Sequence, residues 1–536
     1  MKNYPKILLY IMIYIMMPAL VAGCDFRPLR SPQDLVYHLP SDPTVLNPIL
    51  STDAVSSSVE GLIYEFLVKR NNETLAFEPF LASKWEISDD HLTYTFTLRQ
   101  GIKWQDGKPL TIEDVLYSYE RIKDPKVDAG HLRNYYQDVI SAKKLDEHRI
   151  QFVYRQPYFR ALEIVGGIPI IPKHIFDDGQ NFNMHSANRH PVGTGPYIFE
   201  KWETGSKIVL TRNENYWGEM PAIKGVVFKI IPNADVALQL LKKGDLDFAG
   251  LRPIQWARQT ESQAFKEKFN KYRYWVPNYS YIGWNLSKPY FSDRRVRIAM
   301  TMLLDRKMIL EKMIFDQGEI VSGNFYLFGD AYDKTIDPYP YDPEQAKKLL
   351  DEAGWVDHDG DGVRDKDGLP FKFTFLYASG SEFAKSLSLI MRENLEDVGI
   401  EMDIMPLEWA AFLKEIRGHD FDAATLAWLQ PIEQDPYQIW HSTQVEQGSN
   451  FIGFKNKEAD LLIEQGRREF DPQKRTQLYK KFHKIIHAEE PYTFLFTNPN
   501  LVAIAKRFTN IKQYRGGLDV LEWKVEVIPD QKLIQW

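Results

Sequence analysis

The sequence predicts a mixed α/β fold divided into two or three lobes. Short segments with a period of two, which is typical of half-buried strands, alternate along the chain with amphipathic segments typical of helices. This alternation favours α/β lobes over a β-sandwich or a helical bundle. The chain has 536 residues, whereas a single hydrophobic core rarely serves more than about 250–300 residues. We therefore expect separate lobes, each with its own core.

The elements of these lobes can be placed in order along the chain. Residues 94–98 alternate between apolar and polar side chains and predict a strand. Residues 111–114 (Thr-Ile-Glu-Asp) have the spacing of a capping box, which predicts a helix continuing to residue 121. Further helices, each followed by a glycine suited to end it, are expected over residues 234–243, 343–353 and 381–398, and further strands over 246–248 and 400–404.

The N-terminal residues have the three parts of an export signal. Lys2 and Lys6 supply positive charge, residues 7–17 are apolar, and small residues at 20–23 precede Cys24, the only cysteine of the chain. The apolar part is too short to span a bilayer, which takes roughly 20 apolar residues. The pattern predicts cleavage before Cys24 and lipidation of its thiol. The alternative is an ordinary secretory signal with an incidental cysteine.

Cleavage at this point would make residues 1–23 a lipoprotein signal peptide and residues 24–31 a short lipidated tether. The mature chain is then expected outside the cytoplasm, held in the bilayer by acyl chains. Asp25 resembles the residue that retains many Gram-negative lipoproteins at the inner membrane. We therefore expect the periplasmic face of that membrane, or the outer face of the cytoplasmic membrane in a Gram-positive organism. No second stretch of the sequence approaches the apolar length of a membrane helix.

Composition and motifs argue against several classes of function. The 66 Lys and Arg and 73 Asp and Glu residues are mixed along the chain without a basic stripe, which disfavours nucleic acid as a partner. The sequence has no Gly-x-Ser-x-Gly elbow and no dinucleotide fingerprint. His483 and His487 have the spacing of two zinc ligands, but Lys484 stands where a zinc protease needs glutamate. We expect a binding protein without a required cofactor rather than an enzyme.

Blocks of residues spread in order over the mature chain resemble one family. They are residues 81–90, 96–99, 101–107 (Gly-Ile-Lys-Trp-Gln-Asp-Gly), 113–115, 117–121, 190–197 (His-Pro-Val-Gly-Thr-Gly-Pro-Tyr), 213–217, 293–297, 420–422, 440–442 and 448–450. Together these blocks are similar to those of extracellular solute-binding protein family 5, the dipeptide- and oligopeptide-binding family of ABC importers. Most have structural interpretations; for example, Gly193 and Gly195 suit a sharp crossing of the chain.

The resemblance implies a two-lobed, periplasmic-binding-protein-like α/β fold of the Venus-flytrap, class II type, with an extra inserted domain. Two strands join the lobes, which close over a ligand and present a changed outer surface to a membrane permease. The expected ranges are 32–70, 190–290 and 500–536 for the discontinuous lobe I, 71–189 for the inserted domain and 291–499 for lobe II. We expect a monomer whose partner is an ABC permease of the cytoplasmic membrane.

The resemblance also points to a ligand-binding loop. Peptide-binding relatives often neutralise the α-amino group of the ligand with an aspartate three residues after a tryptophan. The matching tryptophan is Trp428, and the third residue after it is Pro431, which cannot pair with an ammonium group. Glu433 or Asp435 could replace the aspartate if the loop is shifted. The alternative is that this protein does not recognise a free N-terminus, and whether its ligand is a peptide is then undecided.

Five further residues are expected to face the cleft. Asp53 follows the first strand and Tyr136 comes from the inserted domain, whereas Trp409, Trp440 and Asn450 come from lobe II. Aromatic side chains supply contact area with a polar edge, and an amide offers both a donor and an acceptor. Each of these residues could instead serve core packing or surface capping.

Residues 357–368 resemble a calcium-binding loop. Carboxylates occupy positions one, three, five and nine, with glycine at position six, and carboxylate oxygens are the ligands that hard cations prefer. These carboxylates belong to Asp357, Asp359, Asp361 and Asp365. Gly368 stands at position twelve, where a calcium loop has a bidentate glutamate. A structural calcium site and a tight surface turn both remain open interpretations.

The leading hypothesis is a lipid-anchored receptor of an ABC importer that captures peptides or a similar small solute. Its nearest alternative is the same fold with a non-peptide ligand, such as a metal chelate, a haem or an oligosaccharide. A sensory or chaperone-like lipoprotein is a further alternative. A hydrolase is disfavoured because the sequence supplies no recognisable nucleophile.

Overall fold

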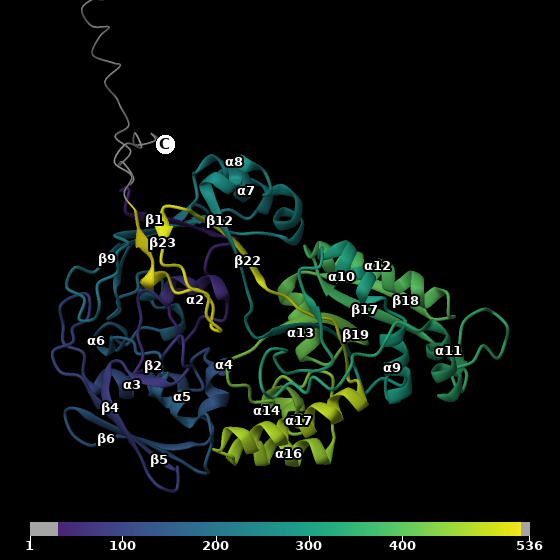
Figure 1. Ribbon diagram of the computed structural model, residues 1–536. Helices are drawn as coiled ribbons and strands as arrows, with labels where there is room; N and C mark the ends of the chain where they lie inside the picture. Colours follow the sequence, from purple (N-terminus) through teal and green to yellow (C-terminus); the bar gives the residue numbers. More distant parts are fainter. Residues whose placement is uncertain (1–30, 527–536) are drawn as a thin grey trace, which may run out of the picture.

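The structure is a computed structural model that describes residues 31–526, and Figure 1 shows two α/β lobes lying side by side. Lobe I is built on a seven-stranded sheet in which β1 runs parallel to β10 and β11. In spatial order its strands are β12 (Phe269–Tyr274), β22 (Asn500–Ala505), β11 (Phe248–Gly250), β1 (Asp34–Leu39), β10 (Gly225–Ile230), β9 (Lys207–Arg212) and β8 (Tyr197–Glu203). Two helices, α7 (Ala234–Lys243) and α8 (Gln263–Lys268), lie at the top of this lobe in Figure 1.

The inserted domain continues the core of lobe I. Its four antiparallel strands are β4 (Ala82–Ile87), β5 (Thr93–Leu98), β7 (Arg149–Tyr154) and β6 (Val139–Lys144), in that spatial order. Its principal helices are α3 (Ile112–Lys123), α4 (Gly130–Arg133), α5 (Ala161–Gly166) and α6 (Lys173–Phe176). Phe96 and Phe152 from this sheet belong to the same buried cluster as Leu210 and Phe228 from the seven-stranded sheet. A shared core of this kind makes lobe I and the inserted domain one mechanical unit.

Lobe II is built on a second sheet with separate cores. Its strands, in spatial order, are β18 (Glu401–Leu407), β17 (Lys372–Ala378), β19 (Ala423–Leu429), β13 (Asn278–Trp284) and β20 (Tyr492–Phe494). Its helices are α9 (Arg294–Met302), α10 (Arg306–Met313), α11 (Pro343–Glu352), α12 (Glu382–Glu396), α13 (Trp409–Arg417), α14 (Tyr437–Trp440), α15 (Gln444–Gln447), α16 (Lys457–Arg468) and α17 (Pro472–Glu489). Because β13 belongs to this sheet, lobe II begins at Asn278 in the structure and not at residue 291.

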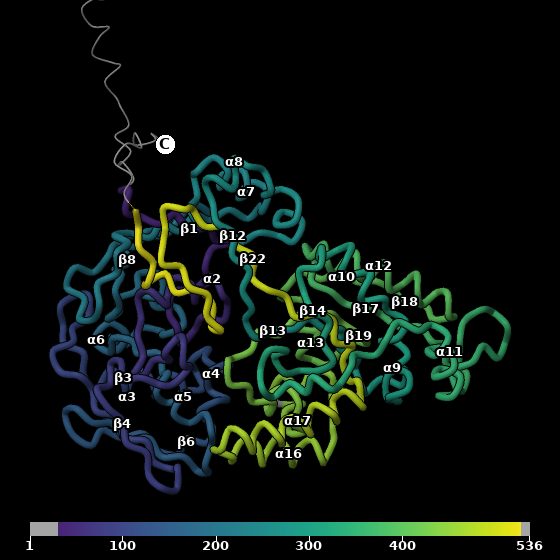
Figure 2. The backbone as a smooth tube through the Cα atoms, viewed as in Figure 1, coloured from purple at the N-terminus to yellow at the C-terminus, as the bar shows by residue number. Residues whose placement is uncertain are grey.

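Two short crossings connect the lobes, as the class II fold predicts (Figure 2). Residues 275–277 lead from β12 of lobe I to β13 of lobe II, and residues 498–499 lead from β21 (Phe496–Thr497) to β22. The crossings are tied together, since the Asn278 side-chain amide donates to the Asn498 carbonyl at 2.8 Å and its oxygen accepts from the Asn498 N–H at 3.0 Å. Within residues 31–526, no helix has the length and apolar character needed to cross a membrane.

Local signals placed several elements well. The α7 helix begins after the Asn233 cap and ends at Gly244, which has the left-handed conformation that favours glycine (φ 89°). The capping box at Thr111 is present, with the Asp114 carboxylate accepting from the Thr111 N–H at 2.8 Å. The strand expected over residues 246–248 is shifted and spans Phe248–Gly250, while Leu246 before it is buried in the small core around α7.

Two of the blocks that resemble the family tie segments of lobe I together. A Cβ atom on Gly193 would lie 1.8 Å from the Ile63 carbonyl oxygen, so only glycine permits this close crossing. Tyr216 and Trp217 both donate to the buried Glu65 carboxylate, at 2.6 and 2.8 Å. These contacts hold the chain entering the inserted domain against the sheet of lobe I.

Candidate binding site between the lobes

The strand β19 leaves one backbone edge unpaired. On one side β13 pairs with it along its whole length, from Ala423 to Leu429. On the other side β17 pairs only with Ala423 and Ala424. Among the described residues, no other strand joins this edge beyond Ala424. An exposed edge of this kind is a template for another extended chain.

The strand register shows which backbone groups face this edge. The Ser280 carbonyl of β13 accepts from Leu495 on the β20 side, so its neighbours Tyr279 and Tyr281 face β19. Their partners Trp428 and Leu426 therefore point toward β13. Alternation along the strand then turns the N–H and C=O groups of Ala427 and Leu429 toward the open side. Both residues are exposed, Leu429 by 70%.

Apolar side chains surround this edge of lobe II. The parallel strands β17, β18 and β19 end on the same side of the sheet, which is where ligands bind in open α/β sheets. Trp409 begins α13 directly after β18 and is 55% exposed. The Trp428 ring stacks at 6.4 Å on Tyr281 and at 6.1 Å on Phe451. The structure thus brings Trp409 and Trp428, two of the expected residues, to the edge where an extended ligand would lie.

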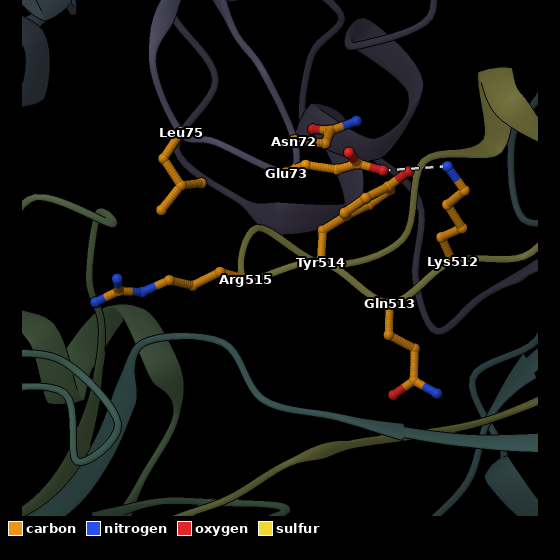
Figure 3. Close-up of a pocket in the computed structure, with 7 residues that line it drawn as sticks. All are labelled: Asn72, Glu73, Leu75, Lys512, Gln513, Tyr514 and Arg515. Carbon is orange, nitrogen blue, oxygen red and sulfur yellow. Dashed lines mark hydrogen bonds and ion pairs between the residues drawn. The ribbon is translucent and has the colours of Figure 1, made fainter.

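A cavity of about 690 Å³ lies between a turn of the N-terminal half and a segment near the C-terminus (Figure 3). It is lined by Asn72, Glu73 and Leu75 from the turn between β2 (Val68–Arg70) and β3 (Phe77–Pro79), and by residues 512–515 near the C-terminus. From the second segment, the Arg515 guanidinium lies 5.4 Å from the Tyr326 ring of lobe II. A Cβ atom on Gly516 would lie 3.7 Å from the Ile432 side chain. The segment that lines the cavity thus contacts lobe II at Tyr326 and at Ile432, three residues after the end of β19.

The loop that follows β19 continues into a set of contacts that join lobe I and its inserted domain to lobe II, which we call the clasp. Its residues are Arg70, Tyr158, Phe159, Glu433, Asp435, Arg467 and Arg475. Glu433 lies 3.1 Å from the Arg70 guanidinium and 3.6 Å from that of Arg475. The Tyr158 hydroxyl donates to Asp435 at 2.8 Å, and the Arg467 Nε donates to the same carboxylate at 3.0 Å. Figure 1 shows α16 and α17, which carry the two lobe II arginines, reaching toward the inserted domain.

Aromatic and backbone contacts complete the clasp. The Arg467 guanidinium lies 4.6 Å from the Tyr158 ring, and that of Arg475 lies 4.1 Å from the Phe159 ring. The Phe159 N–H donates to the Arg467 carbonyl at 2.9 Å. Although burial alone would lower it, the pKa of Arg467 is raised because Asp435 and Tyr158 stabilise its charge. The pKa of Tyr158 is raised by burial and by the Asp435 charge, so this hydroxyl stays protonated and acts as a donor.

These contacts occupy the two acidic residues that could have replaced an aspartate at position 431. Glu433 is paired with two arginines, and the Asp435 side chain is only 4% exposed between Tyr158 and Arg467. Neither carboxylate is available to a ligand ammonium group while the clasp is formed. In this structure the role of both residues is contact between the lobes.

Three of the residues expected to face the cleft are core residues in the structure, which corrects that expectation. Tyr136 is buried in the inserted domain and its hydroxyl donates to the Ile164 carbonyl at 2.9 Å. Trp440 is fully buried against Tyr492. Asn450 is also fully buried, and its side chain bonds the backbone of His441 and Phe454. Residue type does not show burial, because an aromatic or amide group packs equally well in a satisfied core.

Asp53 has a local structural role. It caps α2 (Ala54–Glu60), accepting from the Ser56 N–H at 2.8 Å and from the Thr44 hydroxyl at 2.7 Å. The pKa of Asp53 is lowered although burial opposes this, because these hydrogen bonds stabilise the carboxylate. The sequence reasoning also missed Arg70, Tyr158 and Arg467. Their roles depend on partners far away in the chain, for which no local pattern exists.

The acidic loop of lobe II brings three of its four predicted ligands together. The carboxylate oxygens of Asp357, Asp359 and Asp361 lie within 4.8 Å of one another and are exposed. Asp365 instead accepts from the His358 N–H at 3.0 Å, and its other oxygen lies 3.0 Å from the His358 ring nitrogen. The fourth predicted ligand is therefore engaged within the loop, and any cation would rest on the other three.

Two opposed α/β lobes, a two-stranded hinge and an open strand edge between the lobes define a solute-binding protein of the class II type. The model of the bacterial extracellular solute-binding proteins, family 5, matches residues 76–450, and the chain belongs to this family. The chain is 31% identical over 508 residues to the oligopeptide-binding protein AppA of Bacillus subtilis, covering 91% of each chain. It is 25% identical to the nickel-binding periplasmic protein of Escherichia coli, over 86% of this chain and 88% of that protein.

A solved structure supports the same assignment. The structure of the B. subtilis oligopeptide-binding protein AppA in complex with a nonapeptide superposes with a TM-score of 0.81 at 29% identity. The match covers 92% of this chain and 99% of the AppA chain. The α/β, two-lobed fold expected from the sequence is confirmed.

Proposed function

We propose that this protein captures a peptide in extended conformation between its lobes and delivers it to an ABC permease. The observation that carries the proposal is the unpaired edge of β19, where Ala427 and Leu429 turn their backbone groups toward the gap. Main-chain pairing with such an edge gives affinity without regard to side-chain identity. The peptide ligand of the related AppA structure supports the same assignment.

Closure would follow from ligand pairing. The ligand would contribute contacts to both lobes only in the closed form, and this difference shifts the equilibrium toward closure. The clasp would add contacts that join lobe I and its inserted domain to lobe II in the same state. The permease would then recognise the closed outer surface, while acylated Cys24, which lies outside the described residues, would keep the receptor beside it.

A non-peptide solute is the second candidate, and the loop after β19 favours it. Pro431 replaces the acidic residue that peptide-binding relatives often use, and Glu433 and Asp435 are paired within the clasp. One relative of this chain is named as a nickel-binding protein. The two candidates differ in the mass of the bound species. Native mass spectrometry of the purified full chain should therefore release a ladder of short peptide masses, whereas one discrete non-peptide mass would contradict the peptide proposal.

A backbone variant tests the strand edge directly. Ala427→Pro removes the N–H that faces the open side but leaves the β13 ladder intact, since Ala427 does not donate to β13. Loss of one or two hydrogen bonds at about 1 kcal/mol each should weaken binding of a random pentapeptide pool about 5- to 30-fold in calorimetry. Ala427→Ser keeps the N–H and is the control. Equal affinity of the proline variant and the control would show that the ligand does not pair with β19.

A further inference from the structure

Arg515 is the unpaired cation of the cavity that residues 512–515 line. Among the described residues, its guanidinium makes no hydrogen bond or ion pair, and its Nε is buried without a partner. Its one polar contact is with the Tyr326 ring at 5.4 Å. A guanidinium offers five donors in a planar fork that matches the two oxygens of a carboxylate.

The other charged groups around this cavity already have hydrogen-bond or ion-pair partners. Lys512 pairs with Glu73 at 3.2 Å. Asn72 donates to Asp519 at 2.9 Å, and Tyr514 donates to Glu522 at 2.6 Å. Figure 3 shows the Arg515 side chain extending away from these groups. Among the side chains that line the cavity, Glu73 and Lys512 therefore neutralise each other, which leaves Arg515 as the one cation without an acidic partner; Asp519 and Glu522, which accept from neutral groups, do not line it.

The neighbouring loop supplies no acidic partner to Arg515 either. Arg70, which pairs with Glu433, also donates to the carbonyl of Leu75 at 2.9 Å, so the clasp borders the cavity wall. Glu433 is thereby held in its pairs with Arg70 and Arg475 and cannot neutralise Arg515. Glu73, the carboxylate among the lining residues, is paired with Lys512, so a ligand ammonium placed beside Arg515 would meet an unpaired cation.

We propose that the cavity binds a carboxylate of the ligand through Arg515. This inference rests on the proposed function and adds to it the chemical class of group that the cavity selects. Two sources supply that chemistry in a peptide, namely the C-terminal carboxylate and an aspartate or glutamate side chain. A bidentate contact to a fork of donors would fix the carboxylate, while the β19 edge would hold the adjoining backbone.

The test compares three random pentapeptide pools by calorimetry on the purified full chain. The first pool has free C-terminal carboxylates, the second is amidated and lacks acidic residues, and the third is amidated with one glutamate. We expect the second pool to bind about 10- to 100-fold more weakly than the first. Recovery of affinity by the third pool would assign the contact to a side-chain carboxylate, and no recovery would assign it to the C-terminus.

Variants separate this role from a structural one. Arg515→Gln should weaken binding of the first pool about 10- to 100-fold and leave the affinity for the second pool unchanged. Arg515→Lys should restore part of the lost affinity. Lys512→Gln, in the same segment, is the control and should not discriminate between the pools. Equal weakening of all pools by Arg515→Gln would show that Arg515 acts only through Tyr326 and would overturn the proposal. Strong binding of every pool by the wild type and by Arg515→Gln would overturn the carboxylate proposal while the peptide function stands. Binding of no pool by the wild type would refute both the carboxylate proposal and the peptide function.

Discussion

Replacing Tyr158 with phenylalanine removes one cross-lobe hydrogen bond and little else. The ring, which contacts Arg467 at 4.6 Å, is retained, while the hydroxyl that donates to Asp435 at 2.8 Å is lost. A hydrogen bond to a charged group contributes about 1.5–3 kcal/mol. Asp435 keeps its bonds to Arg467 and to the Tyr437 N–H, both at 3.0 Å, so we expect the lower end of that range. A loss of about 1.4 kcal/mol reduces the ratio of closed to open molecules about tenfold.

Single-molecule energy transfer between the lobes measures this ratio. Cys24 is the only cysteine of the chain, so in a Cys24→Ser background fluorophores can be attached through the substitutions Lys84→Cys and Lys312→Cys. The side chains at these positions are 62% and 66% exposed. The closed fraction is followed as a random pentapeptide pool is added, and Tyr158→Phe should need about tenfold more peptide for half closure. The matched control, Tyr136→Phe, loses a hydroxyl bond inside the inserted domain. Identical closure curves for the two variants would refute the role of the clasp.

Three further predictions concern stability and anchoring. Burial lowers the pKa of His483 from 6.5 to about 4; the unfolded chain thus binds the proton more readily, and the folded protein should lose about 3 kcal/mol between pH 6.5 and 4. In urea titrations His483→Gln should lack this loss, and an unchanged pH slope would contradict the assignment. Cys24→Ser should abolish palmitate labelling and release the protein from membranes, and unchanged membrane binding of this variant would show that the cysteine is incidental. Millimolar calcium should raise the melting temperature of the wild type by about 1–2 °C, and the Asp357→Asn/Asp359→Asn double variant should not show this increase. An unchanged melting temperature of the wild type would show that residues 357–368 form a surface turn without a calcium site.

The sequence predicted those parts of the fold that depend on local signals. The α7 helix, with its asparagine cap and terminal glycine, and the α12 helix, with its apolar period, need only neighbouring residues. The start of lobe II was placed too late because the buried strand β13 looks the same in either lobe. Trp409 and Trp440 have the same residue type, yet one is exposed and the other fully buried. Only packing across the whole lobe distinguishes them.

The clasp could not be predicted for a related reason. Arg70 and Glu433 are separated by 363 positions, and Tyr158 and Asp435 by 277. Each residue, taken alone, has the pattern of a solvated surface charge or a core aromatic. Their pairing exists only once lobe I, with its inserted domain, and lobe II face each other.

One short segment links recognition to closure. In the proposed function Ala427 and Leu429 pair with the ligand, and the chain that follows them reaches Glu433 and Asp435 of the clasp within a few residues. A ligand that pairs with the strand edge immobilises the start of this loop and thereby lowers the conformational entropy cost of placing the two carboxylates against lobe I and its inserted domain. Formation of the clasp, in turn, holds the edge in the position that the ligand requires. Linkage makes the two effects equal, so clasp variants should weaken ligand binding by the factor by which they disfavour closure.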